Sequence, residues 1–475
     1  MSVQTTSGQK TVAEQVAEFA LTLRYEDIPK EVVLAAKMQM LDALGIALLS
    51  NTTEIGKTVY RATIRASARL EAGGARVIGY GTRLPASDTT LINGVFINSL
   101  GFDGTHLGSG IHPCAPALAA VLAAGEEEHA DGHTILAAYI AAIEIDCRLA
   151  GPRGNPFHPR GFHPTALLGT FAAAAAAARL RRLDLPAAVN ALGLCGSKAA
   201  GLIDVLGSWQ LMLHVGWAAH AGLMAASIAA EGFTGAPRIF ESPNGFYQTH
   251  LGFIPTNEEL RLDTLGKHYL TAEVSLKPYP NCQAVQAFTD AAFALKEEGI
   301  GWQEVEHVEY LVTPVCYPLV IDPPTLQEYP LRRDVAGFSI PYAVAGAMIK
   351  GRADYAFYHE DPLDDPEIMS FVKRFDHAPD PDSDFPRHFP GELRVTLRDG
   401  RRIAKRIVAS KGTPEWPMSR SEVETKFLDH ASRVMSRDKA NRLAETVSRI
   451  DDVKDVEELL DAACDVTAEA YRQKR

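Results

Sequence analysis

Three loops rich in glycine and proline carry side chains of the kinds that move protons and bind anions. They read NSLGFDGTHLGSGIHPCAP, GNPFHPRGFHPTALLG and SLKPYPNCQ. An imidazole accepts or returns a proton near neutral pH at little energetic cost, and loops held by a rigid scaffold commonly display such groups. The candidate residues, in chain order, are Asp103, Thr105, His106, His112, His158, Arg160, His163, Lys277 and Tyr279.

Each of these residues also has a purely structural interpretation. A single histidine can be a satisfied core residue, and Asp103 can fix its own loop through an Asx-type turn. Thr165 can cap the helix that follows it, and Lys277 can be an ordinary solvated lysine. Two histidine-bearing glycine loops and a Lys-Pro-Tyr-Pro segment in one chain nevertheless favour a site.

Neither a metal nor an organic cofactor is expected. His106 and His112 lie six residues apart with no carboxylate at ligand spacing, which disfavours a metal. The chain contains no GxGxxG after a strand, no GxxxxGK[ST], no HExxH and no GxSxG. These absences lower the expectation of a nucleotide or zinc enzyme.

Composition limits the class of partner. The formal net charge of -12 argues against nucleic acid, which requires a basic surface, but a local pocket of cations can still bind an anion. The six cysteines are widely spaced, which is typical of reduced thiols. The polar start MSVQTTSGQKTVAEQ shows no secretory signal, and no long uninterrupted apolar window suggests a membrane partner. We therefore expect a cytoplasmic protein.

The elements that must position these loops fall into two groups. From about residue 10 to 265 apolar residues recur at helical spacing, and the alanine run 172–178 predicts a central buried helix. Beyond residue 270, VEHVEYLVTPV and GELRVTLRDGRRIAKRIV alternate as strands do, the second as a hairpin around residues 398–400. The two patterns predict a mainly α protein: a helical domain from residues 1–270, an inserted, lid-like α+β domain from 271–405, and C-terminal helices from 406–475 that return to the helical domain.

The loops, in this order, resemble the MmgE/PrpD family. The resemblance runs from about residue 12 to 460 and includes the segments LDALGIAL, NGVFINSLGFDGTH, HPCAPALAAVLAAGE, RGFHPTALLGTFAAAAAAARL, LHVGWAAHAGLMAASIAAEGFTG, LKPYPNCQ and AGFSIPYAVAGAMIKG. It implies the same two-domain fold, a homodimer, no cofactor and a site between the domains. It also implies that the site residues correspond to Asp103, His112, His163, Lys277 and Tyr342. One position departs, since Leu211 stands where related sequences often carry a lysine.

The resemblance implies proton transfer at a carbon next to a carboxylate of a small polycarboxylate. Our hypothesis makes His163 and His112 the acid/base pair, with Lys277 binding carboxylate and Asp103 orienting an imidazole or hydroxyl. Residues Arg160, Thr105, His106, Tyr279 and Tyr342 are candidate substrate contacts, although packing is the default role of the two tyrosines. Dehydration, as in 2-methylcitrate dehydratases, is the first choice of reaction. Epimerisation of an iminodisuccinate-like acid, decarboxylation of an aconitate-like acid, and a non-catalytic carboxylate-binding relative are the alternatives.

Overall fold

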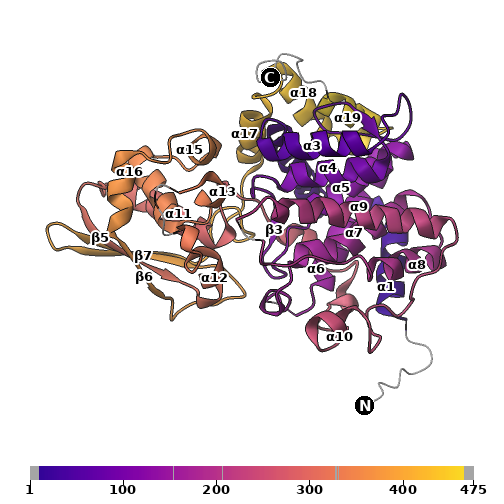
Figure 1. The fold of residues 1–475 in the computed structure, drawn as a ribbon, viewed down its shortest axis with the longest axis horizontal. Helices are drawn as coiled ribbons and strands as arrows, with labels where there is room; N and C mark the ends of the chain where they lie inside the picture. The colour runs from indigo at the N-terminus through magenta and orange to yellow at the C-terminus, as the bar shows by residue number, and fades with distance from the viewer. Residues whose placement is uncertain (1–9, 153, 206, 327–328, 330, 465–475) are drawn as a thin grey trace.

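The computed structural model describes residues 10–152, 154–205, 207–326, 329 and 331–464. It consists of a large helical domain and a smaller domain that contains a four-stranded sheet (Figure 1). The first and last described helices, α1 and α19, both belong to the helical domain (Figure 1). The expected mainly α fold, with an α+β domain inserted into a helical one, is therefore confirmed.

The helical domain is built around one core, to which residues between 12 and 276 and between 418 and 463 contribute. Two short strand pairs, β1 with β2 and β3 with β4, accompany the helices. The strands are β1 (Ala75–Arg76), β2 (Arg83–Leu84), β3 (Thr105–His106) and β4 (Val274–Ser275). The helices are α1 (Val12–Thr22), α2 (Lys30–Ser50), α3 (Glu54–Ala66), α4 (Ala86–Asn98), α5 (Cys114–Glu127), α6 (Gly132–Leu149), α7 (Pro164–Leu180), α8 (Leu185–Cys195), α9 (Gln210–Ala230), α10 (Phe246–Leu251), α17 (Arg420–Ala431), α18 (Arg437–Ser448) and α19 (Glu457–Cys464).

Helix α7 lies at the centre of this domain, as the alanine run predicts. Its seven consecutive alanines are at most 3% exposed, and the helix packs against α5, α6, α8 and α9. Small side chains allow the helices to approach closely. On α9, a Cβ added to Gly222 would lie only 2.3 Å from the carbonyl oxygen of Thr170. The first turn of α7, which carries His163 as its N-cap, is thereby held on a rigid base.

The inserted domain has a second core, contributed by residues between 284 and 397. Its sheet has the strand order β6-β5-β7-β8, and only the β5–β6 pair is parallel. The strands are β5 (Val305–Val312), β6 (Phe375–Pro379), β7 (Gly391–Leu397) and β8 (Arg402–Ile407). The helices are α11 (Gln283–Glu297), α12 (Tyr317–Val320), α13 (Arg333–Ala336), α14 (Ile340–Ala345), which continues as a π-helical turn at Gly346–Lys350, α15 (Tyr355–His359) and α16 (Pro366–Phe371).

The strand predictions for β5 and for the β7–β8 hairpin are confirmed, whereas β6 was not predicted. Strand β6 lies at the edge of the sheet and buries none of its residues fully. An edge strand of this kind has no alternation of buried and exposed residues for a pattern to reveal. The boundaries at residues 270/271 and 405/406 stay a prediction.

The two domains meet where the first candidate loop lies. Phe102 and Leu100, with Ile46 and Leu49 of α2, form a small buried cluster with Tyr355 of the inserted domain. Next to it, β3 pairs antiparallel with β4, so that Thr105 lies opposite Ser275. The segment that leads into the inserted domain is therefore anchored on the loop that carries Asp103.

Two helices, α2 and α9, are long and apolar enough to cross a membrane if length and composition alone are considered. The apolar window of α2 is 78% buried inside the protein, and that of α9 is 50% buried. Core helices commonly pass such a test, so it is weak support for a membrane span. Half of the apolar window of α9 is therefore not fully buried.

Candidate active site

Asp103 is the buried anion of the site. Its side chain is fully buried in the loop after α4, and its Oδ1 accepts a hydrogen bond from the Asn98 side chain at 3.0 Å. The same Oδ1 lies 3.4 Å from Nδ1 of His112. Burial alone would raise the pKa of Asp103, but His112, Lys277 and Asn98 outweigh it and lower that pKa. Asp103 is therefore an ionised group that faces an imidazole.

His112 lies between the buried carboxylate and solvent. Its Nδ1 is 3.4 Å from Oγ1 of Thr105 as well as from Asp103, while its side chain remains 26% exposed. Its backbone N–H donates to Oγ1 of Thr165 at 3.1 Å. Thr165 thus ties the first loop to α7, whereas the N-cap position is taken by His163. A carboxylate on one ring nitrogen orients the imidazole and leaves the other nitrogen for proton exchange.

His163 is buried and pairs with a second histidine. Its Nδ1 lies 3.2 Å from Nδ1 of His214 on α9, and its backbone N–H donates to Gly201. Burial, followed by the charges that His214, His112 and His158 would carry, holds the pKa of His163 well below its ordinary value. Burial, with His112, lowers the pKa of His158 to about 4. The site therefore contains neutral imidazoles that can accept a proton.

Lys277 follows β4 and brings a cation to the same place. Its side chain is buried, and Nζ donates to the carbonyl oxygen of Gly101 at 2.7 Å, two residues before Asp103. Burial lowers the pKa of Lys277, while Asp103 and Asp42 oppose that effect. The β3–β4 pairing positions this lysine, and a local sequence pattern cannot show that pairing.

The structure brings together Asp103, Thr105, His112, His163 and Lys277, and His158 interacts electrostatically with His112 and His163. The remaining candidates make contacts of their own. Arg160 is exposed, and its Nε donates to the carbonyl oxygen of His250 at 3.3 Å. Tyr342 is fully buried in the core of the inserted domain and stacks on Phe357. The substrate-binding roles of both residues stay predictions.

Tyr279 and His106 have protein partners of their own. The Tyr279 hydroxyl donates to Asp290 at 2.9 Å. His106 is buried, its Nδ1 accepts from the Ser109 backbone at 3.2 Å, and its Nε2 lies 3.5 Å from Glu273. Burial lowers the pKa of His106 although Glu273 opposes this effect. Their candidate roles as substrate contacts likewise stay predictions.

Three residues near the site were not among the candidates. His214 lies in the middle of a helical pattern rather than in a glycine-rich loop, so only its place in the LHVG segment pointed to it. Asp42 was visible as a carboxylate inside the apolar stretch LDALGIAL of α2. Lys426 lies among the charged residues of α17 and offered no signal.

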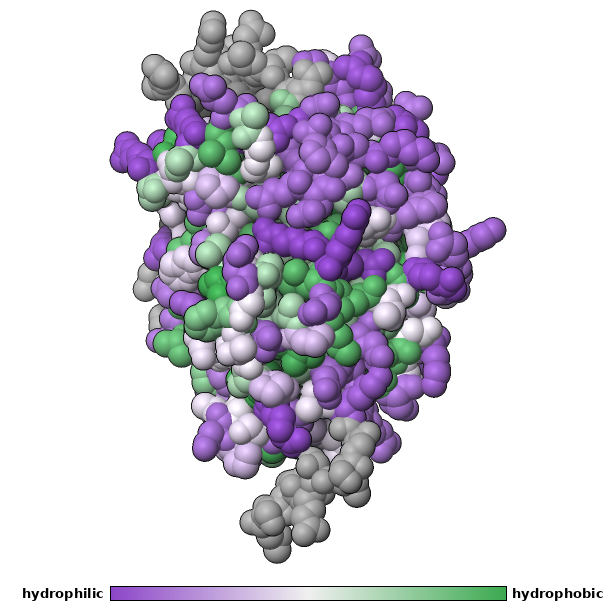
Figure 2. All heavy atoms as spheres, turned by 90° about the vertical axis from the view of Figure 1, so that its right-hand side faces the viewer, coloured by the Kyte–Doolittle hydropathy of each residue, from purple (hydrophilic) through white to green (hydrophobic). Residues whose placement is uncertain are grey.

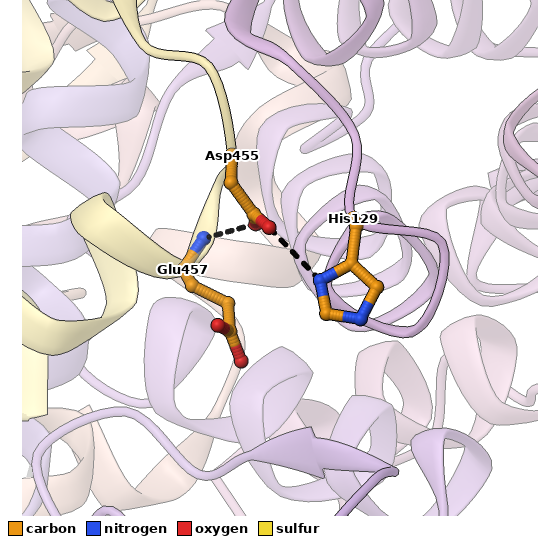
Figure 3. A group of neighbouring side chains, drawn as sticks. All are labelled: His129, Asp455 and Glu457. Atoms are coloured by element: carbon orange, nitrogen blue, oxygen red, sulfur yellow. Dashed lines mark hydrogen bonds and ion pairs between the residues drawn. The ribbon is translucent and has the colours of Figure 1, made fainter.

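A possible metal-ligand group lies outside this site. His129, Asp455 and Glu457 place one ligand atom each within 4.8 Å of one another (Figure 3). Asp455 already accepts from the Glu457 backbone at 2.9 Å and contacts Nδ1 of His129 at 2.9 Å, and a Glu457 oxygen pairs with Arg83. The three side chains are partly or largely exposed, so existing contacts account for the group. Within the described ranges, the site histidines are not part of any such three-donor group.

Comparisons with known proteins identify the family of this chain. The N-terminal domain model of the MmgE/PrpD family matches residues 14–256, and its C-terminal domain model matches residues 279–452. The chain is 25% identical to the cis-aconitate decarboxylase of Mus musculus over 464 residues, which cover 94% of this chain and 92% of the mouse protein. It is 25% identical to the Homo sapiens enzyme of the same name, over 94% of this chain and 93% of that protein. It is 24% identical to the cis-aconitate decarboxylase of Aspergillus terreus, over 96% of both chains. Since the two family models together span the helical domain, the inserted domain and the loops that join at His112 and His163, this chain belongs to the MmgE/PrpD family.

Proposed function

We propose that this protein is a cofactor-independent lyase that acts on a small polycarboxylate by proton transfer at a carbon next to a carboxylate. The observation that carries the proposal is the convergence of an Asp103–His112 pair, a neutral His163 and the buried Lys277 on one junction of the fold. Membership of the MmgE/PrpD family supports the same class of chemistry.

Each residue has a role that follows from its surroundings. Lys277 holds a substrate carboxylate, since Asp103 and Asp42 favour its charged form against burial. His163, neutral because it is buried beside His214, accepts the proton from the carbon. His112, oriented by Asp103, is the acid that returns a proton to the departing or remaining group. Cations and donors around the substrate stabilise the negative charge that develops on the carboxylate as the proton leaves.

Two finer reactions can use these residues: dehydration needs both the base and the acid, whereas decarboxylation needs only the acid. In decarboxylation the bond to the departing carboxylate breaks, carbon dioxide leaves, and the acid supplies the proton that replaces it. In dehydration the base removes a carbon-bound proton, the electron pair forms the double bond, and the acid protonates the departing hydroxyl. The names of the relatives favour decarboxylation, whereas dehydration was the first choice from the sequence. Epimerisation is a third outcome of the test. It is kept because Leu211, one turn before His214, stands where related sequences often carry a lysine.

The test is proton NMR in D2O with purified, EDTA-treated protein and a panel of citrate, 2-methylcitrate, cis-aconitate, malate and iminodisuccinate. New vinyl signals with release of carbon dioxide identify a decarboxylase, and vinyl signals without it identify a dehydratase. Deuterium uptake at the α-carbon without elimination identifies an epimerase. No exchange with any member of the panel contradicts the proposal and favours a carboxylate-binding protein without catalysis.

We also propose that two copies of the chain associate through α9. Trp217 and Ile228 on α9, with Trp209 and Phe233 at its two ends, are between 40% and 60% exposed. The spacing of Trp209, Trp217 and Ile228 places them on one side of the helix. Large exposed apolar groups of this kind commonly mark protein interfaces.

Apolar side chains also gather across the middle of the face turned away from the inserted domain (Figure 2).

Light scattering at micromolar concentration is expected to give twice the monomer mass, and Ile228→Glu is expected to return the protein to a monomer. A monomeric wild type would contradict the association.

A further inference from the structure

A buried ion pair contacts the two segments that carry Asp103 and Lys277. Lys426 of α17 and Asp42 of α2 have side chains 7% and 1% exposed, and Nζ lies 2.6 Å from Oδ1. The ammonium group also donates to the carbonyl oxygens of Phe102 at 3.2 Å and of Lys277 at 2.9 Å. It lies 3.6 Å from the centre of the Phe102 ring. The three N–H groups of this lysine therefore have three oxygen neighbours.

The two carbonyl groups belong to the two segments that the site requires. Phe102 directly precedes Asp103, and the second carbonyl is that of Lys277 itself. One ammonium group thus links the loop that orients His112 to the segment that carries the substrate-binding cation. The connection runs from the C-terminal part of the chain, after the inserted domain, to loops before and at the domain junction.

Stability alone does not require charges at this position. Removing two charges from water is costly, and apolar residues of similar volume often hold two helices together equally well. Burial raises the pKa of Asp42 and lowers that of Lys426, while each partner opposes the shift of the other. What an apolar pair could not supply is the pair of hydrogen bonds to the Phe102 and Lys277 carbonyl oxygens.

We infer that Lys426, balanced by Asp42, is a positioning residue that sets the separation of Asp103 and Lys277 in the active site. The inference rests on the proposed function, because the separation of Asp103 and Lys277 matters for catalysis only if both residues act in the proposed reaction. Lys426 itself needs no contact with substrate. A displacement of about 1 Å in a catalytic constellation can lower a rate by roughly 100-fold, which makes the effect measurable.

The test compares Lys426→Met, Asp42→Asn and the double variant Asp42→Asn/Lys426→Met with the wild type. The single variants leave one buried charge unpaired and are expected to lower the melting temperature. The double variant removes both charges and is expected to recover stability. A matched control is Lys37→Met/Asp451→Asn, because Lys37 also lies on α2, pairs with Asp451 at 2.6 Å and donates to a carbonyl oxygen, that of Ser448.

Two readouts separate positioning from a purely structural role. In the folded double variant kcat is expected to fall about 10-fold or more, with the control close to wild type. Hydrogen exchange followed by mass spectrometry is expected to quicken in peptides that cover residues 98–112 and 274–282, again without change in the control. Exchange does not depend on turnover, so it tests the inference even if the wild type shows no activity and the proposed function fails. A stable double variant with wild-type kcat and unchanged exchange would overturn the inference.

Discussion

Replacing His163 with glutamine is the sharpest test of the proposed chemistry. Glutamine keeps a hydrogen-bonding group within reach of His214 but cannot accept a proton at neutral pH. The side chain of His163 makes no capping hydrogen bond to α7, so the helix start is retained. Its side-chain partner across the site is His214, at 3.2 Å. The variant should therefore lose about 1 kcal/mol of stability, the worth of one hydrogen bond.

The expected loss of activity is much larger. A general acid or base supplies about 10²–10⁴ in rate, which corresponds to roughly 3–5 kcal/mol of transition-state stabilisation. Burial and three neighbouring imidazoles lower the pKa of His163, so it is unprotonated at neutral pH, which is the state that a base requires. The loss should appear in kcat, since the imidazole is not proposed to bind the substrate carboxylate.

The assay measures initial rates with whichever substrate the NMR panel identifies, together with thermal melting of each variant. His307→Gln is the control, because His307 lies on β5 of the inserted domain and its side chain is 42% exposed and pairs with Asp376 at 3.0 Å. That variant should retain wild-type kcat. If folded His163→Gln retains activity within about 10-fold of wild type, its role as acid or base is refuted.

Lys277→Met removes the cation proposed to hold a carboxylate; a charge-assisted hydrogen bond is worth about 1.5–3 kcal/mol, so kcat/KM should fall roughly 10- to 150-fold. Steady-state kinetics check this expectation, and an unchanged kcat/KM would contradict it. Acid should destabilise the protein between pH 6.5 and about 4, because His158 has an ordinary pKa of 6.5 that burial lowers to about 4 in the folded state, so the unfolded state binds the proton first. His158 alone lowers the free energy of unfolding by about 3 kcal/mol by pH 4. The melting temperature of His158→Asn should therefore depend less steeply on pH than that of the wild type, and parallel curves would contradict this role of His158. Dialysis against EDTA should leave the rate unchanged, since the site histidines belong to no three-donor group within the described part of the chain; a loss restored by a divalent cation would contradict this.

The sequence alone determined the architecture and singled out most of the residues of the candidate site. Helical spacing before residue 270 and strand alternation after it separate the two domains, because periodicities of 3.6 and 2 reflect burial on one face of each element. Histidines among glycines and prolines made His112 and His163 candidates, because loops on a rigid scaffold commonly carry functional groups. Strand β6 escaped the pattern because an exposed edge strand has no buried face.

The tertiary structure alone decided which of these residues meet. The β3–β4 pairing joins Thr105 and Ser275, 170 residues apart in the chain, and so brings Lys277 to the Asp103 loop. The same long-range packing brings His214 to His163 and Lys426 to Asp42. It also keeps Arg160 exposed and Tyr342 inside the second core. Local patterns reflect the surroundings of one segment, whereas a site that joins several distant segments depends on contacts that no single segment encodes.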